Sequence, residues 1–443
     1  MRLVLSEKKK AMLWFIVFKI VLDLTYVLIQ ADAYGYYGFS FEPNIAKWLF
    51  SWILYLFTGL CVASDKTNCC TIFSYTVFML SLAPAFVYYE YNPEAKLWML
   101  LAQALTLVLM NAIMGALTAK VKIKNKKIPY TSRRLSFIVV LVLGAYFVYS
   151  FVTNGLPSLG SLSWENVSEI RANSNVSTLM AIIQNLLCRI VCPITLMLLF
   201  KSRKWVGFAL VLVIQLYTYA ITGFKTYLFI PLVLIAVSIL PKINLKKLIS
   251  FALPCVVVLC NLIYKVLGEI YPYALINERV LFLPAKIKFA YFDYFSSHDF
   301  VYFSQSTIAK LFGFESNYSQ NIPNLIGDVY FNRPEMWTNT GFMADAYANL
   351  GILGMVLIGV LLAVILAWVD VTVECDSPDV MLGIQSMFLL YYISLNDGSA
   401  ISVFFSGGMI FAVLLVLFIS FNGRMRKRKG IKRVKTAEVS ENG

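Results

Sequence analysis

The residues whose types could do chemistry are concentrated in one polar stretch, residues 269–346, of an otherwise apolar chain. This stretch holds His298, the only histidine among 443 residues, and Asp299 follows it directly. Histidine is the usual general base near neutral pH, and a neighbouring carboxylate raises its basicity. The pair therefore predicts proton transfer. A structural role for the histidine stays open, because adjacent side chains need not face each other.

Basic residues that could bind an anion are the second group of candidates. They are Arg279, Lys286 and Lys288 in the same stretch, Arg171 beside Glu169 in residues 154–178, Lys225 in a tight hairpin, and Arg189 within an apolar segment. Guanidinium groups bind phosphate oxygens in bidentate fashion. A lone arginine inside a membrane segment is a functional candidate by default. Taken singly, the others also fit solvated charges or lysines that snorkel to the membrane surface.

Other kinds of catalytic site are not indicated by the sequence. It contains no GxGxxG, P-loop, HExxH or GxSxG pattern, and one histidine cannot build a histidine-based metal centre. Cys188 and Cys192 lie four residues apart on one expected helix face, where packing is the favoured interpretation. We therefore expect no metal and no cofactor. The formal net charge of +14 is explained by basic cytoplasmic loops, so it does not indicate nucleic-acid binding.

The elements that must position these residues are apolar segments long enough to cross a membrane. Hydrophobic residues make up 59% of the chain, which predicts an all-α membrane protein with about twelve transmembrane helices in one domain, residues 1–443. The expected spans are residues 11–30, 45–63, 71–89, 97–118, 135–153, 179–200, 205–222, 226–240, 248–267, 347–369, 380–395 and 401–420.

Topology follows from the distribution of lysine and arginine, which cluster in alternate loops and in the tail, residues 421–443. Both termini are then cytoplasmic, and residues 154–178 and 269–346 form outer loops. The tail is expected to lie against anionic lipid. The aromatic run of residues 285–295 fits either an amphipathic segment in the membrane interface or a platform for sugar rings.

This pattern resembles the Wzy-type polymerases of O-antigen and capsule repeat units. Three segments carry the local resemblance: Ser168-Glu169-Ile170-Arg171, Thr222-Gly223-Phe224-Lys225-Thr226, and Asn339-Thr340-Gly341-Phe342 with residues 346–354 after it. They are similar to the family's arginine-bearing outer loop, to its Ser-Gly-x-Arg-type hairpin, and to the end of its large loop. Lys225 stands where arginine is usual, and an Arg-x10-Gly pattern of some members has no counterpart from Arg171 or Arg279.

The resemblance implies a glycosyltransferase of the bacterial inner membrane. Its donor and acceptor are glycans on undecaprenyl pyrophosphate, and a chain-length-regulating co-polymerase is a possible partner. Arg171, Arg279 and Lys225 would stabilise the leaving pyrophosphate. His298, Asp299 or Glu169 would accept the proton. Two alternatives stay open: a flippase or other transporter of lipid-linked oligosaccharides, and an O-antigen ligase-like transferase. The ligases often carry a His-Asn pair, of which only Asn339 is present, so polymerase is favoured.

Overall fold

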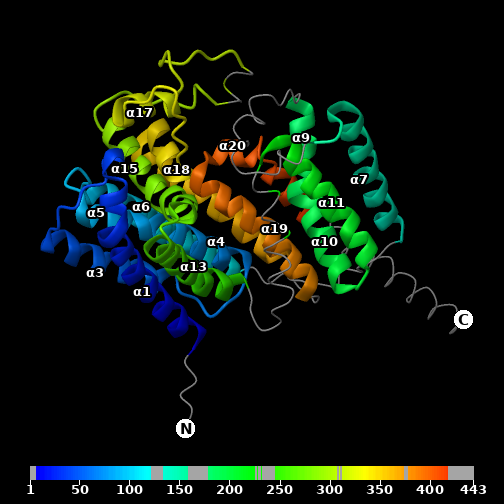
Figure 1. Ribbon diagram of the computed structural model, residues 1–443, viewed down its shortest axis with the longest axis horizontal. Coiled ribbons are helices and arrows are strands. Elements are labelled where there is room, and N and C mark those ends of the chain that lie inside the picture. The colour runs from blue at the N-terminus through cyan, green and yellow to red at the C-terminus, as the bar shows by residue number, and fades with distance from the viewer. Residues whose placement is uncertain are drawn as a thin grey trace, which may run out of the picture. The chain divides into compact units, whose positions relative to one another are not determined.

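The computed structural model describes residues 6–120, 133–157, 178–224, 227, 231, 245–306, 309, 312–373 and 378–417. All regular elements in these ranges are helical, as the sequence predicts. The chain divides into two compact units (Figure 1). Unit 1 comprises Met1–Lys120, Asn244–Trp368 and Tyr391–Phe405, and unit 2 comprises Val121–Ile243, Val369–Leu390 and Ser406–Gly443.

Unit 1 holds most of the described helices. Its first half contains α1 (Glu7–Thr25), η1 (Tyr26–Gln30), α2 (Ala31–Ala33), η2 (Gly35–Tyr37), α3 (Ile45–Val62), α4 (Cys69–Val77), η3 (Phe78–Leu82), α5 (Ala83–Tyr91) and α6 (Leu97–Lys120). Its second half contains α13 (Leu245–Leu267), α14 (Ile270–Tyr273), η6 (Ala274–Phe282), α15 (Leu283–Phe295), α17 (Ile322–Phe331), most of α18 (Phe342–Val373), the end of α19 (Pro378–Asp397), and α20 (Ala400–Phe404).

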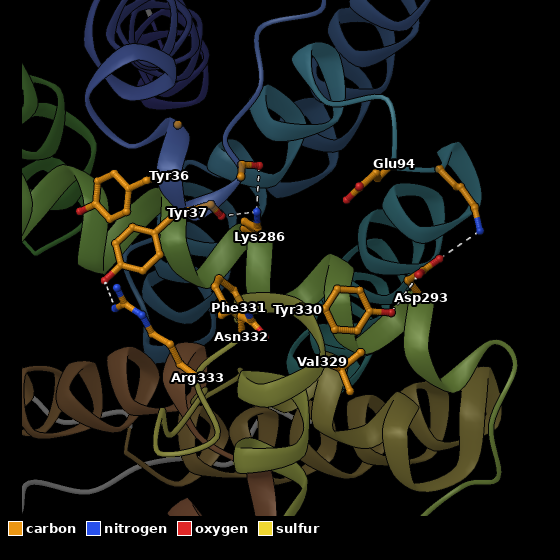
Figure 2. A pocket seen from close by; sticks show the side chains of 13 residues that line it. Tyr36, Tyr37, Glu94, Lys286, Asp293, Val329, Tyr330, Phe331, Asn332 and Arg333 are labelled. Atoms are coloured by element: carbon orange, nitrogen blue, oxygen red, sulfur yellow. Dashed lines mark hydrogen bonds and ion pairs between the residues drawn. The ribbon is translucent and has the colours of Figure 1, made fainter.

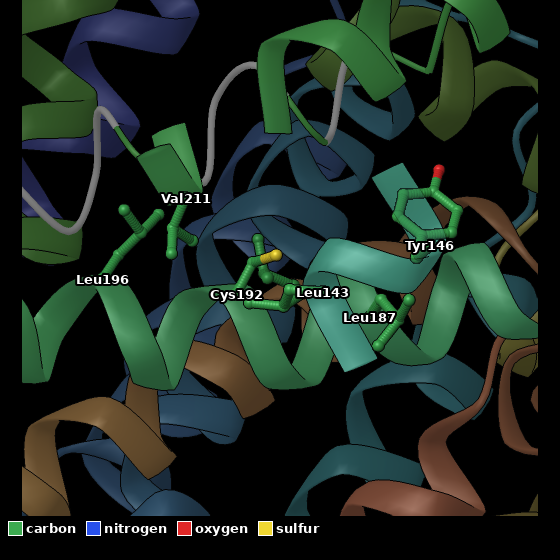
Figure 3. Packing of buried hydrophobic residues seen from close by; sticks show 7 residues of the cluster. Leu143, Tyr146, Leu187, Cys192, Leu196 and Val211 are labelled. Atoms are coloured by element: carbon green, nitrogen blue, oxygen red, sulfur yellow. The ribbon is translucent and has the colours of Figure 1, made fainter. Parts of the chain in front are cut away.

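Unit 2 contains the remaining described helices. They are α7 (Arg133–Asn154), α9 (Thr178–Leu186), η5 (Leu187–Val191), α10 (Cys192–Lys201) and α11 (Trp205–Thr222), with the end of α18, most of α19 and a helix that begins at Met409. Its apolar core joins Leu143 and Tyr146 of α7 to Leu187, Cys192 and Leu196, as Figure 3 shows. Cys192 is fully buried in this cluster, and Cys188 packs against Tyr219 and Tyr227. Both cysteines therefore act as small apolar core residues.

Seven described helical segments are long and apolar enough to cross a membrane, so the chain is a helical membrane protein. They are Glu7–Ala33, Ile45–Val62, Cys69–Tyr91, Leu97–Ala119, Trp205–Thr222, Leu245–Leu267 and Phe342–Thr372, and each matches an expected span. The expected spans at 135–153 and 179–200 correspond to shorter apolar helices. Residues 226–240 lie almost entirely outside the described residues, and residues 380–395 lie in α19.

One expected span is wrong in its boundaries. Residues 401–420 do not begin as one continuous helix, because α20 ends at Phe404 and Gly408 takes a left-handed backbone with φ 86°. A new helix begins only at Met409. Glycine adopts this conformation at little cost, and a break there turns the chain after a short helix.

The helix Cys69–Tyr91 lies at the centre of unit 1. In its 18-residue apolar window 94% of the residues are buried, and α3, α6, α13 and α15 all pack against parts of the helix. Asn68 begins the helix by accepting a hydrogen bond from the Thr71 amide, which is the usual role of an N-cap. A helix that is apolar on nearly every side is surrounded either by lipid or by other helices, and here other helices surround it. This packing explains why α15 contacts α5 and η3 rather than lying at the membrane surface.

The polar stretch of residues 269–346 is largely helical rather than an extended loop. α14, η6 and α15 follow one another without a break from Ile270 to Phe295 and pack on α13 and α5. All α15 residues from Pro284 to Phe295 except Asp293 are buried. The expectation of an interfacial amphipathic segment at residues 285–295 is therefore wrong, because the aromatic side chains pack on the central helix.

Buried charge is concentrated at one point of unit 1. Lys19 has no exposed surface, and its ammonium lies 2.7 Å from Asp23 and 2.6 Å from Glu90. The sequence predicts the Lys19–Asp23 pair from its spacing of four residues, whereas Glu90 comes from a different helix. An unpaired charge in a low-dielectric interior is strongly destabilising, so Lys19 joins α1 to α5.

We predict that Lys19→Met lowers the free energy of unfolding by about 3–5 kcal/mol, because it leaves Glu90 buried without a cation. Glu90→Gln should lower the free energy of unfolding by a smaller amount, since Lys19 keeps its ion pair with Asp23. Thermal unfolding of the purified protein in one detergent, followed by size-exclusion chromatography, measures both. Equal melting temperatures for Lys19→Met and the wild type would contradict this role.

Candidate functional site

A cleft of about 800 Å³ lies between four segments of unit 1, and we call it the tyrosine cleft (Figure 2). The turn Gly35–Gly38 forms one wall, and the loop before α6 forms a second. One face of α15 and the C-terminal end of α17 complete it. Its lining residues are Gly35, Tyr36, Tyr37, Gly38, Glu94, Lys96, Lys286, Asp293, Val329, Tyr330, Phe331, Asn332 and Arg333.

The turn that carries Tyr36 and Tyr37 is held by a buried lysine. Lys286 is 7% exposed, and its ammonium donates hydrogen bonds to the Tyr37 and Gly38 carbonyls. Gly38 has φ 76°, and a Cβ there would collide with the Lys286 ammonium. The left-handed backbone favours glycine at this position, and a side chain there would also displace the Lys286 ammonium. The lysine fixes the tyrosines in place while its charge stays beside the cleft.

The loop that carries Glu94 and Lys96 is held in the same way. The Lys47 ammonium donates to three carbonyl oxygens around this loop, those of Asn92, Pro93 and Ala95, at 2.7–3.2 Å. Lys96 pairs with Asp293 across the cleft at 3.0 Å. Glu94 points into the cavity (Figure 2) and makes no ion pair or hydrogen bond within the described residues.

The end of α17 supplies the third group of cleft side chains. Asn332 ends the helix in a left-handed conformation with φ 56°, which turns Arg333 toward the cleft. The Arg333 guanidinium donates to the Tyr37 hydroxyl at 2.9 Å and lies 5.0 Å from the centre of its ring. Gly327 allows the chain at Arg333 to approach α17, because a Cβ there would collide with backbone oxygens.

Charges in the cleft are mixed. Three cations and two carboxylates line it: Lys96, Lys286 and Arg333, and Glu94 and Asp293. Burial lowers the pKa of Lys286 to about 8, and the negative charge of Glu94 opposes this shift. The Tyr330 hydroxyl donates to Asp293 at 2.9 Å, so Asp293 is engaged on both oxygens. Glu94 is therefore the carboxylate of the cleft that stays open to a ligand.

Arg279, predicted from the sequence to bind an anion, lies at the margin of the cleft. Its side chain is 69% exposed and 3.9 Å from Glu278. Burial raises the pKa of Glu278 to about 7, and the Arg279 charge opposes the rise. Arg279 and Arg333 both act electrostatically on Tyr36, a lining residue. The two guanidinium groups therefore lie near one wall.

The structure separates the other sequence candidates. Lys288 is 1% exposed and donates to the Ser81 hydroxyl of η3, on a different face of α15 from Lys286. Arg189 lies half-buried in η5 of unit 2. Arg171, Glu169 and Lys225 lie outside the described residues. Of the predicted anion-binding residues that the structure describes, Lys286 lines the tyrosine cleft and Arg279 lies near its margin.

His298 lies just beyond the C-terminal end of α15 and lines none of the three described cavities. Its Nδ1 donates to the Tyr294 carbonyl at 2.8 Å, and its ring stacks on Tyr294 with centroids 3.9 Å apart. A histidine in this position satisfies a terminal helix carbonyl. Asp299 is exposed, and its carbonyl accepts a hydrogen bond from the Tyr318 hydroxyl. These contacts fit a structural role for the pair, and its role in proton transfer stays a prediction.

Sequence reasoning missed Tyr36, Tyr37, Glu94 and Arg333. A signal was present in Tyr34-Gly35-Tyr36-Tyr37-Gly38, where tyrosines stand between two glycines in a segment that cannot continue a helix. Aromatic rings with carboxylates and cations suit a ligand that carries both sugar rings and negative charge. Comparison of the chain with protein-family models, with curated proteins and with solved structures gives no match.

We predict that Lys286 reacts with acetic anhydride with half-maximal rate near pH 8, because burial disfavours its ammonium form. Glu94→Gln should lower this midpoint further, since it removes the charge that favours the ammonium. Mass spectrometry of the peptide that carries Lys286, after brief labelling across a range of about pH 6–11, measures the midpoint. A midpoint near the ordinary lysine pKa of about 10.4 in both proteins would contradict the buried environment.

Proposed function

We propose that this protein is a glycosyltransferase that polymerises undecaprenyl-pyrophosphate-linked oligosaccharide repeat units. The product would be O-antigen or capsular polysaccharide, made at the outer face of a bacterial inner membrane. The observation that carries the proposal is the tyrosine cleft, which combines aromatic rings, cations and an open carboxylate beside membrane-length helices. The resemblance in membrane architecture to Wzy-type polymerases supports the same reaction.

The cations of the cleft fit the leaving group of this reaction. The acceptor hydroxyl attacks the anomeric carbon, the bond from that carbon to the pyrophosphate oxygen breaks, and undecaprenyl pyrophosphate leaves with the electron pair. Preorganised cations lower the barrier by stabilising this developing charge. Arg333 offers a planar fork for phosphate oxygens. Lys286 uses two of its three N–H donors on the Tyr37 and Gly38 carbonyls, which leaves one for the ligand.

The acceptor hydroxyl must also lose a proton, and Glu94 is our candidate for the group that accepts it. Its carboxylate points into the cleft, whereas Asp293 is held by Lys96 and Tyr330. His298 and Asp299, the sequence candidates, lie elsewhere on the unit. Arg171 and Lys225 remain candidates for binding the pyrophosphate, and Glu169 remains a candidate proton acceptor. Arg189 of unit 2 remains a candidate for anion binding.

The rival functions differ in the step that each of them carries out. A flippase or other transporter moves lipid-linked oligosaccharide without making a glycosidic bond. A ligase-like transferase makes one bond to a different acceptor and does not lengthen the glycan. A gene-deletion strain separates them, because loss of a polymerase leaves single repeat units on the lipid core, whereas loss of a flippase or a ligase leaves none.

We predict that Arg333→Ala lowers polymer formation roughly 10²–10³-fold, the usual effect of losing one charge-stabilising donor. Arg333→Lys should restore part of the polymer formation, because lysine keeps the positive charge but lacks the planar guanidinium fork. Arg279→Ala tests the second guanidinium in the same way. Polysaccharide ladders from a complemented deletion strain, at equal amounts of membrane protein, give the measurement. Lys265→Ala, an exposed cation at the end of α13, is the control. Wild-type ladders from both alanine variants would remove the cleft from the reaction.

A separate comparison identifies the proton acceptor. We predict that Glu94→Gln lowers the rate roughly 10²–10⁴-fold, the range for loss of a general base. His298→Gln should keep most activity, because glutamine can still donate to the Tyr294 carbonyl. Rates of repeat-unit consumption by purified variants decide between the two residues. The opposite pattern, an inactive His298→Gln and an active Glu94→Gln, would return the histidine to the reaction.

A further inference from the structure

A second cavity, of about 440 Å³, lies on another face of α15, and we call it the acidic pocket. Tyr291 of α15 lines it, whereas Lys286 and Asp293 line the tyrosine cleft. Asn321, Ile322 and Pro323 bring the N-terminal end of α17 to the pocket, while the C-terminal end of α17 reaches the cleft. The two cavities therefore share α15 and α17 as walls.

Several polar side chains of the pocket have no protein partner. The Thr340 hydroxyl belongs to a residue that is 6% exposed, and it makes no hydrogen bond. Asn339, Asp345 and Asp397 also line the pocket, and their side chains make no hydrogen bond or ion pair within the described ranges. Buried polar groups in proteins are almost always satisfied. Of these four residues, Thr340 is buried and Asp345 is half-buried, whereas Asn339 and Asp397 are exposed. The buried Thr340 hydroxyl is therefore the unsatisfied group that indicates a polar ligand.

Two other side chains of the pocket, those of Gln305 and Asn349, are held by hydrogen bonds to the protein. Gln305 donates to the Ser316 hydroxyl and to the Gln320 carbonyl, and it accepts from the Ile322 amide. Asn349 accepts from the Phe303 amide at 2.7 Å and donates to the Asp345 carbonyl. Gln305 and Asn349 also line the cavity, so these bonded side chains hold its walls in place beside the unpartnered groups.

A glycine brings the two sides of the pocket together. Gly341 is buried, and a Cβ there would collide with the backbone of Leu395 and Asn396 at the end of α19. The absence of a side chain lets the beginning of α18 approach the end of α19. Thr340 and Asp397, neighbours of these contact points in the chain, come to one cavity as a result.

The charge of the pocket is opposite to that expected of a phosphate site. Asp345 and Asp397 line it, and no lysine or arginine does among the residues with a described position. Burial raises the pKa of Asp397 to about 6, and the Lys288 charge opposes the shift. Trp337, 56% exposed, adds an aromatic face. Carboxylates, an amide and a hydroxyl around an aromatic ring can bond sugar hydroxyls and cover an apolar sugar face.

We propose that the acidic pocket binds one uncharged sugar residue, whose hydroxyls bond Asp345, Asp397 and Thr340 and whose ring lies on Trp337. Binding of the sugar does not depend on the polymerase reaction. That this sugar belongs to the second lipid-linked glycan rests on the proposed function. The cations then hold the donor pyrophosphate in the tyrosine cleft, and the carboxylates repel a second phosphate from the pocket.

The experiment is saturation-transfer NMR on the full-length protein in lipid nanodiscs with methyl glycosides of glucose, galactose, mannose and N-acetylglucosamine. We expect at least one of them to bind, and Thr340→Val to weaken that binding about tenfold through loss of one hydrogen bond to a buried group. Asp397→Asn and Trp337→Ala should weaken it at least as much. Asp328→Asn, an exposed acid on α17 outside both cavities, should bind as the wild type does.

Thr340→Val also separates a ligand site from a structural one. Because the Thr340 hydroxyl has no partner, its removal should leave the melting temperature equal or higher while sugar binding falls. Inorganic pyrophosphate should leave the sugar signals unchanged, since it is drawn to the cleft. Three outcomes overturn the proposal: no glycoside binds the wild type, binding is equal in all variants, or Ca²⁺ binds in a manner that Asp397→Asn abolishes while no sugar binds. Sugar binding without any polymer synthesis would instead remove the proposed function alone.

Discussion

Ammonium groups held away from water are the constraint on which unit 1 depends. Lys19 joins α1 to α5 through Glu90, Lys47 caps the loop before α6, and Lys286 caps the turn before α3. Lys246 does the same for the turn between α3 and α4. Backbone carbonyls outside helices need partners where water is excluded, and a lysine supplies three donors from one side chain. The bonds of Lys47 and Lys286 fix two of the loops that form the tyrosine cleft.

The same constraint explains why α15 separates two unlike cavities. The helix is buried on nearly every side, so its polar side chains must either pair with the protein or face a cavity. Lys286 and Asp293 face the tyrosine cleft, where cations outnumber carboxylates. Tyr291 faces the acidic pocket, where carboxylates are alone among the charges that the structure describes. Two neighbouring cavities of different charge suit an enzyme that must hold two similar glycans and distinguish their roles.

The fold could be predicted from the sequence where the signal is local. Apolar runs located the seven membrane-length helices, and a spacing of four residues identified Lys19 and Asp23 as a pair. Glu90 could not be assigned to that pair, because it lies 71 residues away from Lys19. The polarity of residues 269–346 suggested a loop, yet α15 is a buried helix, because its aromatic residues pack on the central helix while its lysines find partners.

The candidate site was predictable only in part for a similar reason. Lys286 and Arg279 stood out as cations, but Tyr37, Glu94 and Arg333 reach the cleft from three distant parts of the chain. The lone histidine also stood out in the sequence, but His298 lies beyond the end of α15 and does not line the tyrosine cleft. The measurement that tests the account most directly uses purified protein in detergent with a purified lipid-linked repeat unit as sole substrate. The account predicts glycans of increasing length and one undecaprenyl pyrophosphate released per bond, both lost in Arg333→Ala. Unchanged repeat units with the wild-type protein would contradict it.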